Sequence, residues 1–332
     1  MKIIITGGTG FIGRHLAESF HKDGIEILAT GRSPEAGKKL TKAGIKFEPA
    51  DITDSDKLVS IFTPADIVIH CAARYGDHGT KQEFFETNIA GTRNVIRACK
   101  KHDIRKIIFI STPSIYYNGK DRFKISESDP LPKKQATHYG RTKLICESEL
   151  LALAEEGFKT IIFRPRAVYG PYDKTIMYRI LKLSERKKFP LINNGRALAD
   201  ITSVYNLVDA VKKCLNAADD IWNEVYNISN DEPISMKEWF SEMLKALDRP
   251  FKPKNIPEGA AKIMGMAMYL LSLMPFGPKR PPLTPFAVGY MAKSMTMSIE
   301  KAKEKLSYSP PVDNKEGFRR LSVWYHSALD QD

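Results

Sequence analysis

The sequence predicts an α/β protein with a doubly wound parallel sheet and a smaller, mostly helical C-terminal lobe. Short apolar runs rich in β-branched residues alternate with helical patterns in the first half of the chain, and this alternation is typical of parallel sheets. A glycine-rich turn joins the first run to the first helical pattern. The chain has 332 residues, 42% of them hydrophobic, which is enough for one large domain or two unequal lobes.

The first expected element is a short buried strand at residues 2–6, which stops at a run of glycines. Gly7, Gly10 and Gly13 have the spacing GxxGxxG rather than GxGxxG, and a helical pattern continues from Arg14. Such glycines permit a tight turn, let the backbone approach a pyrophosphate and let the helix pack close to the strand. A plain turn is the alternative, but the motif requires this strand–turn–helix context. The pattern therefore predicts a Rossmann-type dinucleotide site.

The end of the second expected strand, residues 26–30, indicates which dinucleotide binds. A site that prefers NAD places an acidic residue there, on the ribose 2′-hydroxyl. Here Arg32 follows instead, and a guanidinium suits a 2′-phosphate. We therefore expect NADP(H), with NAD(H) as the alternative in which Arg32 stacks on adenine or points to solvent. Arg14 and Lys38 are further basic residues that can assist.

Later strands, each followed by a loop, are expected at 66–70, 107–110, 160–163 and 224–228. Ligands of open parallel sheets bind outside the carboxyl ends of the strands, so these loops are the predicted site. Helices are expected around 206–215 and 234–247. The predicted division of the chain is a nucleotide domain at 1–165, rejoined by 197–228, and a substrate lobe formed by 166–196 and 229–332.

Tyr139 and Lys143 stand four residues apart on an expected helix, so both side chains share one helix face. An ammonium close to a phenol lowers its pKa, so that the tyrosine can give and take a proton. Taken alone, the pair is far more typical of a solvated helix face. The dinucleotide motif upstream favours the catalytic interpretation.

Composition excludes several classes of protein. The net charge is +12, but the basic residues are scattered, which argues against a nucleic-acid module. We interpret them as a solvated basic surface, with an attraction to anionic ligands or membrane surfaces as the alternative. The four cysteines show no metal-ligand spacing, so we expect no metal site and a reducing, cytoplasmic location. We see no signal peptide and no apolar stretch long enough to span a bilayer.

Several motifs in register resemble the extended short-chain dehydrogenase/reductase family, also called the NAD(P)-dependent epimerase/dehydratase family. Their order and spacing agree over essentially the whole chain. They are the glycine motif Thr6–Gly13, Asp51-Ile52 after the third strand, His70-Cys71-Ala72-Ala73, Asn88–Thr92, the serine-rich loop Ser111–Tyr116, Tyr139 with Lys143, and Arg164–Pro171.

The resemblance implies roles for these residues and a homodimer formed by helices near 84–101 and 137–153. Tyr139 is expected to be the general acid/base, and Lys143 to hold the nicotinamide ribose and depress the Tyr139 pKa. Thr112 is expected to bind the substrate oxygen, with strand-end capping as the alternative. Asn88 is expected to fix its helix and the neighbouring loops. The implied cofactor-binding set is Gly7, Gly10, Phe11, Ile12, Gly13, Arg32, Asp51, Ile52, Ala72, Ala73, Asn88, Tyr139, Lys143 and Pro165.

Within the family, the chain is most similar to the 3β-hydroxysteroid dehydrogenase-like branch. Nucleotide-sugar enzymes typically carry Asn where this chain has Ala167, and dehydratases often carry an Asp-Glu pair where Pro113-Ser114 stands.

Residues 257–285 form a methionine-rich segment, which we interpret as a core helix, as a wall for an apolar substrate, or as a membrane-touching surface edged by Lys279-Arg280. The predicted substrate contacts are Ser114, Arg166, Ala167, Met264 and Met268.

Together these features predict an NADP(H)-dependent oxidoreductase that interconverts a secondary alcohol and a ketone on a mainly apolar substrate. Sterol-like, β-hydroxy/β-keto acyl and other lipid or polyketide compounds are the expected classes. A nucleotide-sugar epimerase is one alternative, and a catalytically idle NADP-sensing regulator is another.

Overall fold

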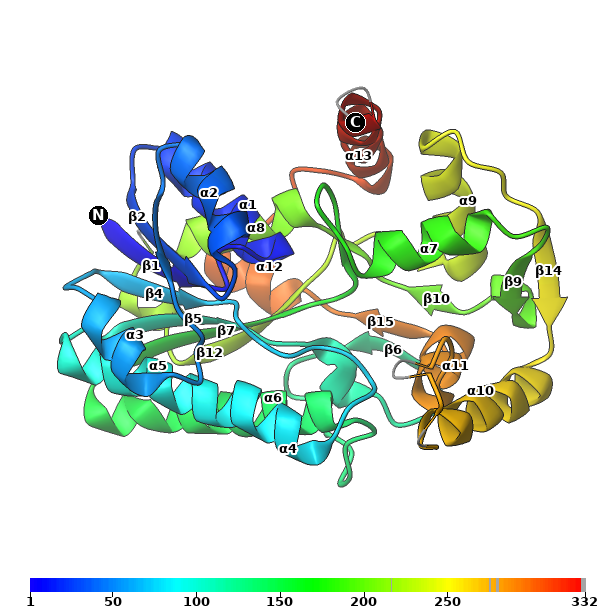
Figure 1. The fold of residues 1–332 in the computed structure, drawn as a ribbon, viewed down its shortest axis with the longest axis horizontal. Helices are drawn as coiled ribbons and strands as arrows, with labels where there is room; N and C mark the ends of the chain where they lie inside the picture. The colour runs from blue at the N-terminus through cyan, green and yellow to red at the C-terminus, as the bar shows by residue number, and fades with distance from the viewer. Residues whose placement is uncertain (216, 275, 279–280, 330–332) are drawn as a thin grey trace.

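The computed structural model describes residues 1–215, 217–274, 276–278 and 281–329. Its larger lobe is built on a seven-stranded parallel sheet with the order β12-β7-β5-β4-β1-β2-β3 (Figure 1). This arrangement confirms the predicted fold class. The strands are β1 (Lys2–Thr6), β2 (Glu26–Gly31), β3 (Lys46–Pro49), β4 (Ile67–His70), β5 (Lys106–Ile110), β7 (Lys159–Pro165) and β12 (Glu224–Ile228).

Helices cover both faces of this sheet because successive strand residues point to opposite faces. Ile3 and Ile5 of β1 pack in one core cluster and Ile4 packs in the other. The first cluster is covered by α1 (Phe11–Lys22), α8 (Val204–Leu215) and α12 (Glu300–Leu306). The second is covered by α3 (Ser55–Ile61), α5 (Gly91–Lys101) and α6 (His138–Ala152), while α2 (Pro34–Lys42) packs on β3.

One late segment differs from the predicted division of the chain, which placed all of 229–332 in the substrate lobe. Ile299, Ala302 and Leu306 are buried in the core of the large sheet, with Tyr308 beside them. Their spacing of three and four residues gives α12 an apolar face, and this face packs on α8 and β12. The chain therefore returns to the sheet a second time.

The second lobe holds a small four-stranded sheet of order β13-β10-β15-β6 and two strand pairs, β11–β8 and β14–β9. Strand β6 (Arg122–Ile125) comes from within the predicted nucleotide domain. The other strands are β8 (Val168–Tyr169), β9 (Phe189–Ile192), β10 (Leu198–Ala199), β11 (Thr202–Ser203), β13 (Ile234–Ser235), β14 (Pro253–Ile256) and β15 (Met295–Met297). Around them lie α7 (Ile176–Ser184), α9 (Met236–Ala246), α10 (Glu258–Ser272), α11 (Pro285–Ala292) and α13 (Asn314–Leu329).

Short helical turns complete the chain, and several of them carry site residues. They are α4 (Lys81–Phe84), the π-helical turn η1 (Phe85–Ala90), and the 3₁₀ turns η2 (Pro113–Tyr116), η3 (Leu153–Glu156), η4 (Asn193–Gly195) and η5 (Asp219–Ile221).

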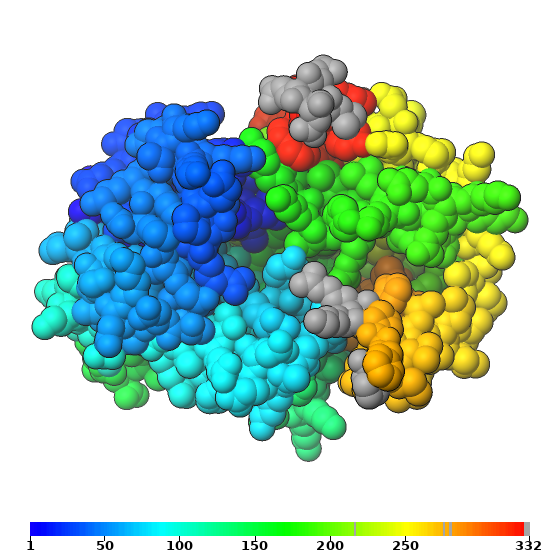
Figure 2. Space-filling view, in the orientation of Figure 1, coloured from blue at the N-terminus to red at the C-terminus, as the bar shows by residue number. Residues whose placement is uncertain are grey.

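The methionine-rich helix α10 is not the core helix that was one of the three interpretations. Ala261 and Gly265 are its only buried residues, and Gly265 allows close packing on α11, since a Cβ there would lie 3.0 Å from a methyl group of Val288. Apolar side chains on the rest of the helix, including Ile263 and Leu270, are exposed. Figure 2 shows this segment (gold) on the surface, at the end of the molecule opposite the N-terminal strands. No helix in the described part of the chain is long and apolar enough to cross a membrane.

Candidate active site

The glycine turn lies against the loop that follows β4. Gly7 has a positive φ of 71°, and a Cβ on it would stand 2.7 Å from the amide nitrogen of Ala72. A Cβ on Gly13 would stand 2.3 Å from the carbonyl oxygen of Gly7. Each position therefore requires glycine, for its conformation or for the close approach of α1 to the strand. The structure brings Gly7, Gly10, Gly13 and Ala72 together at one end of the sheet, with Ala73 next in the chain, and their binding of a cofactor stays a prediction.

The start of α1 fits the pyrophosphate of a dinucleotide. Gly10 is the N-cap residue and provides no side-chain hydrogen bond, and the first turn holds no acidic residue. The N–H groups of this turn, including those of Phe11 and Ile12, are therefore not capped by a side chain and carry the positive end of the helix dipole. Such a helix start is a ready anion site.

The predicted adenosine end of this site lies beside β2 and β3. Arg32 follows β2 and Asp51 follows β3, with 3.8 Å between Arg32 Nε and Asp51 Oδ2, and both side chains are accessible. Ile52 is buried under Gly91 at the start of α5. The two predicted assistants are engaged elsewhere: Arg14 with Glu18 and the Tyr172 ring, and Lys38 with Glu35.

His70 ties three elements together below the site. Its Nδ1 lies 2.6 Å from Thr6 Oγ1 on β1, and its Nε2 lies 3.0 Å from Thr92 Oγ1 on α5. Burial, with a smaller contribution from the Lys143 charge, lowers the pKa of His70 to about 3. The ring is therefore neutral near pH 7 and serves as a structural link rather than an acid.

Asn88 connects the loop after β4 to the helix that carries the tyrosine and the lysine. Its Oδ1 accepts from the Arg74 backbone N–H at 2.7 Å, and its Nδ2 donates to the Arg74 carbonyl at 3.0 Å and to Thr142 Oγ1 at 2.9 Å. It lies in the π-helical turn η1, a distortion often found at functional sites. This geometry is what the predicted positioning role of Asn88 requires.

Thr112, Ser114 and Tyr139 meet where β5 ends. Thr112 Oγ1 accepts from the Ser114 backbone N–H at 3.2 Å and donates to Ser114 Oγ at 3.1 Å, so it also caps η2. Tyr139, in the first turn of α6, is half-buried. Burial raises the pKa of the Tyr139 phenol, while the nearby Thr112 hydroxyl acts in the opposite direction.

Lys143 is buried one turn further along α6. Its Nζ donates to the Ile110 carbonyl at 2.6 Å and lies 3.9 Å from the centroid of the Phe109 ring. Burial lowers the pKa of Lys143 to about 8. The expected depression of the Tyr139 pKa by Lys143 is not what the structure shows, because burial of the phenol dominates and the ammonium is directed at the Ile110 carbonyl.

A buried polar network under these residues was not foreseen from the sequence. Glu147 accepts hydrogen bonds from Ser111 and from Arg164, with Nε at 3.1 Å and Nη2 at 2.5 Å. Arg164 also donates to the Tyr116 hydroxyl, which donates to Asn227 Oδ1 at 3.0 Å. The one sequence signal was the position of Glu147, four residues after Lys143 and thus on the same helix face.

The predicted substrate residues are only partly brought together. Pro165 and Arg166 are buried at the end of β7, and Ala167 has a positive φ of 43°. Met264 on α10 is exposed and Met268 is partly buried. The aromatic rings that pack on Tyr117, just after η2, come from α11 instead: Phe286 at 5.2 Å and Tyr290 at 5.7 Å between ring centroids.

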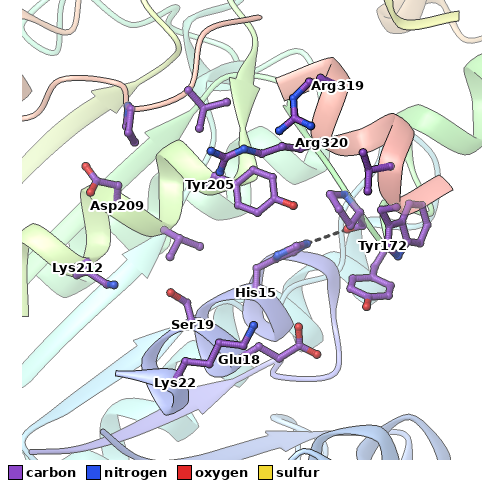
Figure 3. A pocket seen from close by; sticks show the side chains of 16 residues that line it. His15, Glu18, Ser19, Lys22, Tyr172, Tyr205, Asp209, Lys212, Arg319 and Arg320 are labelled. Atoms are coloured by element: carbon purple, nitrogen blue, oxygen red, sulfur yellow. Dashed lines mark hydrogen bonds between the residues drawn. The ribbon is translucent and has the colours of Figure 1, made fainter. Parts of the chain in front are cut away.

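A pocket of about 600 Å³ lies away from these residues. Figure 3 shows it between α1, α8 and α13, with His15, Tyr205 and Arg320 pointing into it. His15 Nε2 lies 2.9 Å from the carbonyl oxygen of Pro171. Because α1 and α8 cover the face of the sheet opposite α6, this pocket is separate from the cluster of Thr112 and Tyr139.

The fold and the site define a dinucleotide-binding protein with a tyrosine and a lysine at the carboxyl ends of its parallel strands. The chain belongs to the NAD dependent epimerase/dehydratase family, which matches residues 3–229. This membership confirms the predicted family and the predicted enzyme class, an NAD(P)-dependent dehydrogenase or reductase acting on a CH–OH or C=O group.

Two curated relatives extend over nearly the full chain. A 2-alkyl-3-oxoalkanoate reductase of Stenotrophomonas maltophilia is 30% identical over 330 residues, 97% of this chain and 99% of the relative. A decarboxylating sterol-4-alpha-carboxylate 3-dehydrogenase of Saccharomyces cerevisiae is 29% identical over 363 residues, 98% of each chain. Among solved structures, the UDP-glucuronic acid 4-epimerase of Bacillus cereus in complex with UDP-glucuronic acid and NAD has a TM-score of 0.76 at 24% identity, covering 99% of this chain and 100% of its own.

Proposed function

We propose that this protein is an NADP(H)-dependent oxidoreductase that interconverts a secondary alcohol and a ketone on a mainly apolar substrate. The observation that carries the proposal is the meeting of Thr112, Ser114 and Tyr139 where β5 ends, one helical turn from buried Lys143. A bound nicotinamide supplies or accepts the hydride. The residues of the chain hold the reacting oxygen and move its proton.

In the reductive direction, Tyr139 gives its proton to the carbonyl oxygen as the carbonyl carbon receives the hydride. Burial raises the pKa of Tyr139, so the phenol is protonated near neutral pH, which is the form that this step requires. The Thr112 hydroxyl donates a hydrogen bond to the same oxygen and supports its developing charge. Lys143 binds the ribose hydroxyls, as its place on the same face of α6 allows.

The names of the two relatives support a lipid-like substrate. One acts on a 2-alkyl-3-oxoalkanoate and the other on a sterol-4-alpha-carboxylate, so β-keto acyl and sterol-like compounds are the leading classes. The likeness to a nucleotide-sugar epimerase shows the fold alone, at 24% identity. Ala167 stands where those enzymes typically carry an asparagine, which favours the oxidoreductase over an epimerase.

The preference for NADP(H) over NAD(H) rests on Arg32. Its side chain is exposed at the end of β2, and Asp51 at 3.8 Å is a loose partner that a 2′-phosphate can replace. Arg32→Gln should lower the ratio of kcat/KM for NADPH to that for NADH by about tenfold, the effect of one charge-assisted hydrogen bond. A ratio that does not change assigns Arg32 to adenine or to solvent.

Two partner surfaces also belong to the proposal. The exposed apolar side chains of α10, among them Ile263, Leu270 and Leu271, support peripheral contact with a membrane. The basic pair Lys279-Arg280, expected at its edge, lies outside the described residues. A homodimer through the helices near 84–101 and 137–153 is proposed from the family resemblance.

The proposed activity is tested with Tyr139→Phe. The wild-type enzyme should oxidise NADPH with at least one ketone from a panel of medium-chain 3-oxo esters, cyclic ketones and 3-oxosteroids. Tyr139→Phe should lower kcat by about 10²- to 10⁴-fold and leave the Kd for NADPH within about threefold. Tyr178→Phe, on the exposed surface of α7, is the matched control and should keep full activity.

Two results contradict the proposal. Turnover of a UDP-sugar with no reduction of any ketone favours the epimerase. Tight NADPH binding without turnover of the ketones or the UDP-sugar favours the catalytically idle regulator.

A further inference from the structure

Arg166 is a buried cationic side chain that hydrogen-bonds the Tyr290 hydroxyl but leaves two of its guanidinium nitrogens without a partner in the described part of the chain. The residue is 2% exposed, and neither Nε nor Nη1 has a partner within the described part of the chain. Burying a charge costs several kcal/mol unless it is paired, and a guanidinium cannot escape that cost by losing its proton. Arg164, two residues earlier, shows the usual solution, since it is paired with Glu147 and Tyr116.

The backbone of Arg166 is fixed by two hydrogen bonds. Its N–H donates to the Ile228 carbonyl at 3.1 Å, and its carbonyl accepts from Thr202 Oγ1 at 2.6 Å. Arg166 therefore sits rigidly just beyond β7, at the carboxyl end of the sheet where the site residues gather.

Tyr290 places Arg166 next to the catalytic cluster. The guanidinium carbon lies 4.1 Å from the centroid of the Tyr290 ring, a cation–π contact. Tyr290 in turn packs on Tyr117, with 5.7 Å between ring centroids, and Tyr117 directly follows the η2 turn that carries Ser114. Tyr290 therefore connects Arg166 to the end of β5, where Thr112 and Ser114 lie.

Asp200 is a nearby acid, but it does not neutralise Arg166 by direct contact. Its Oδ2 accepts from the Met297 backbone N–H at 2.5 Å, whereas its Oδ1 has no partner among the residues that the structure describes. No ion pair within 4.0 Å joins Asp200 to Arg166 in those same residues, and the Arg166 charge lowers the pKa of Asp200 only against the larger effect of burial, which raises that pKa to about 6. The Asp200 carboxylate thus stabilises the Arg166 charge without direct contact. The free N–H groups of the guanidinium can therefore donate hydrogen bonds to another group.

We propose that Arg166 binds a carboxylate of the substrate, next to the carbonyl that Tyr139 protonates. This inference rests on the proposed oxidoreductase function and names its substrate class as an oxo acid with an apolar body. A planar guanidinium matches a carboxylate in shape and charge. The stacked rings of Phe286 and Tyr290 beside it suit the apolar part of such a molecule.

The experiment compares an acid with its uncharged ester. NADPH-dependent reduction of 3-oxododecanoate and of its methyl ester is measured for wild type, Arg166→Gln and Arg166→Lys. Wild type should prefer the acid in kcat/KM. Arg166→Gln should lower kcat/KM for the acid by about 10- to 100-fold, mainly through KM, and change that for the ester by less than about threefold. Arg166→Lys should restore part of the preference because it restores the charge.

The controls separate a binding role from a structural one. NADPH affinity and the unfolding midpoint are recorded for each variant and for Asp200→Asn. If Arg166 merely pairs with Asp200, Arg166→Gln and Asp200→Asn will lower the midpoint alike and leave the acid-to-ester ratio unchanged, which overturns the inference.

The wild-type rates with acid and ester test the inference even if none of the variants folds. Reduction of acid and ester with equal kcat/KM overturns the inference and leaves the proposed function standing. If the wild-type enzyme reduces neither of these two substrates and no ketone of the wider panel, the inference and the proposed function are both overturned.

Discussion

Breaking the buried ion pair between Glu147 and Arg164 should destabilise the protein far more than breaking an exposed pair on the same helix. Arg164 and Glu147 side chains are 6% and 2% exposed, and Arg164 approaches both carboxylate oxygens. Glu147→Gln leaves the Arg164 charge buried without a counter-charge. Removing one partner of a buried pair costs about 3–5 kcal/mol.

The expected shift in melting temperature follows from the size of the chain. Unfolding entropy is about 2.1 cal/mol/K per residue, so 332 residues give roughly 0.7 kcal/mol/K. A loss of about 3–5 kcal/mol therefore lowers Tm by about 4–7 °C. Glu149→Gln is the matched control two residues away. It breaks the more exposed pair with Arg93 and should cost under about 1 kcal/mol.

Calorimetry and urea unfolding of the two variants test this reasoning, and a third variant tests its cause. Adding Arg164→Met to Glu147→Gln removes the uncompensated charge and should recover part of the lost unfolding free energy. The reasoning is refuted if Glu147→Gln and Glu149→Gln lower Tm equally, or if the double variant is less stable than Glu147→Gln alone.

Two further predictions concern the cofactor turn and the buried lysine. Gly13→Ala places a methyl group 2.3 Å from the Gly7 carbonyl oxygen, so it should weaken NADPH binding at least about tenfold in fluorescence titration. Gly259→Ala is the control, because Gly259 has open space around it, and this change should leave the Kd for NADPH unchanged. Because the pKa of Lys143 is about 8 in the folded protein and 10.5 for an ordinary lysine, the unfolded chain binds more protons between these pH values. The unfolding free energy of wild type, measured relative to Lys143→Met, should therefore rise by about 3 kcal/mol from pH 8 to pH 10.5, and a difference independent of pH would contradict the shift.

The fold and the glycine turn could be predicted because both depend on residues that are close together in the sequence. The strand at 2–6 is a continuous β-branched run, and Gly7 and Gly13 follow it at fixed distances. Such patterns depend on neighbours in the sequence, which is why the order of strands and helices was foreseen. The family motifs then assigned Thr112, Tyr139 and Lys143 to one place, and the structure puts them there.

The rest depends on contacts between distant residues. Glu147, Arg164 and Asn227 form one network over 80 positions of sequence, and each looks like an ordinary polar residue in its own segment. Amphipathic periodicity predicts that α12 is a helix with an apolar face, but it does not tell which lobe that face meets. The same limit applies to α10, where an apolar composition does not distinguish a buried helix from an exposed one.

The late return of α12 to the large sheet has a consequence for how the protein is made. Ile299, Ala302 and Leu306 complete a core that begins with Ile3 and Ile5, so this core joins residues about 300 positions apart. During synthesis the ribosome must release almost the whole chain before that face of the sheet is covered. Until then the nascent sheet exposes apolar surface, the condition in which chaperones are needed. The two lobes are therefore interwoven parts of one folding unit, and cutting the chain between them would not yield two independent domains.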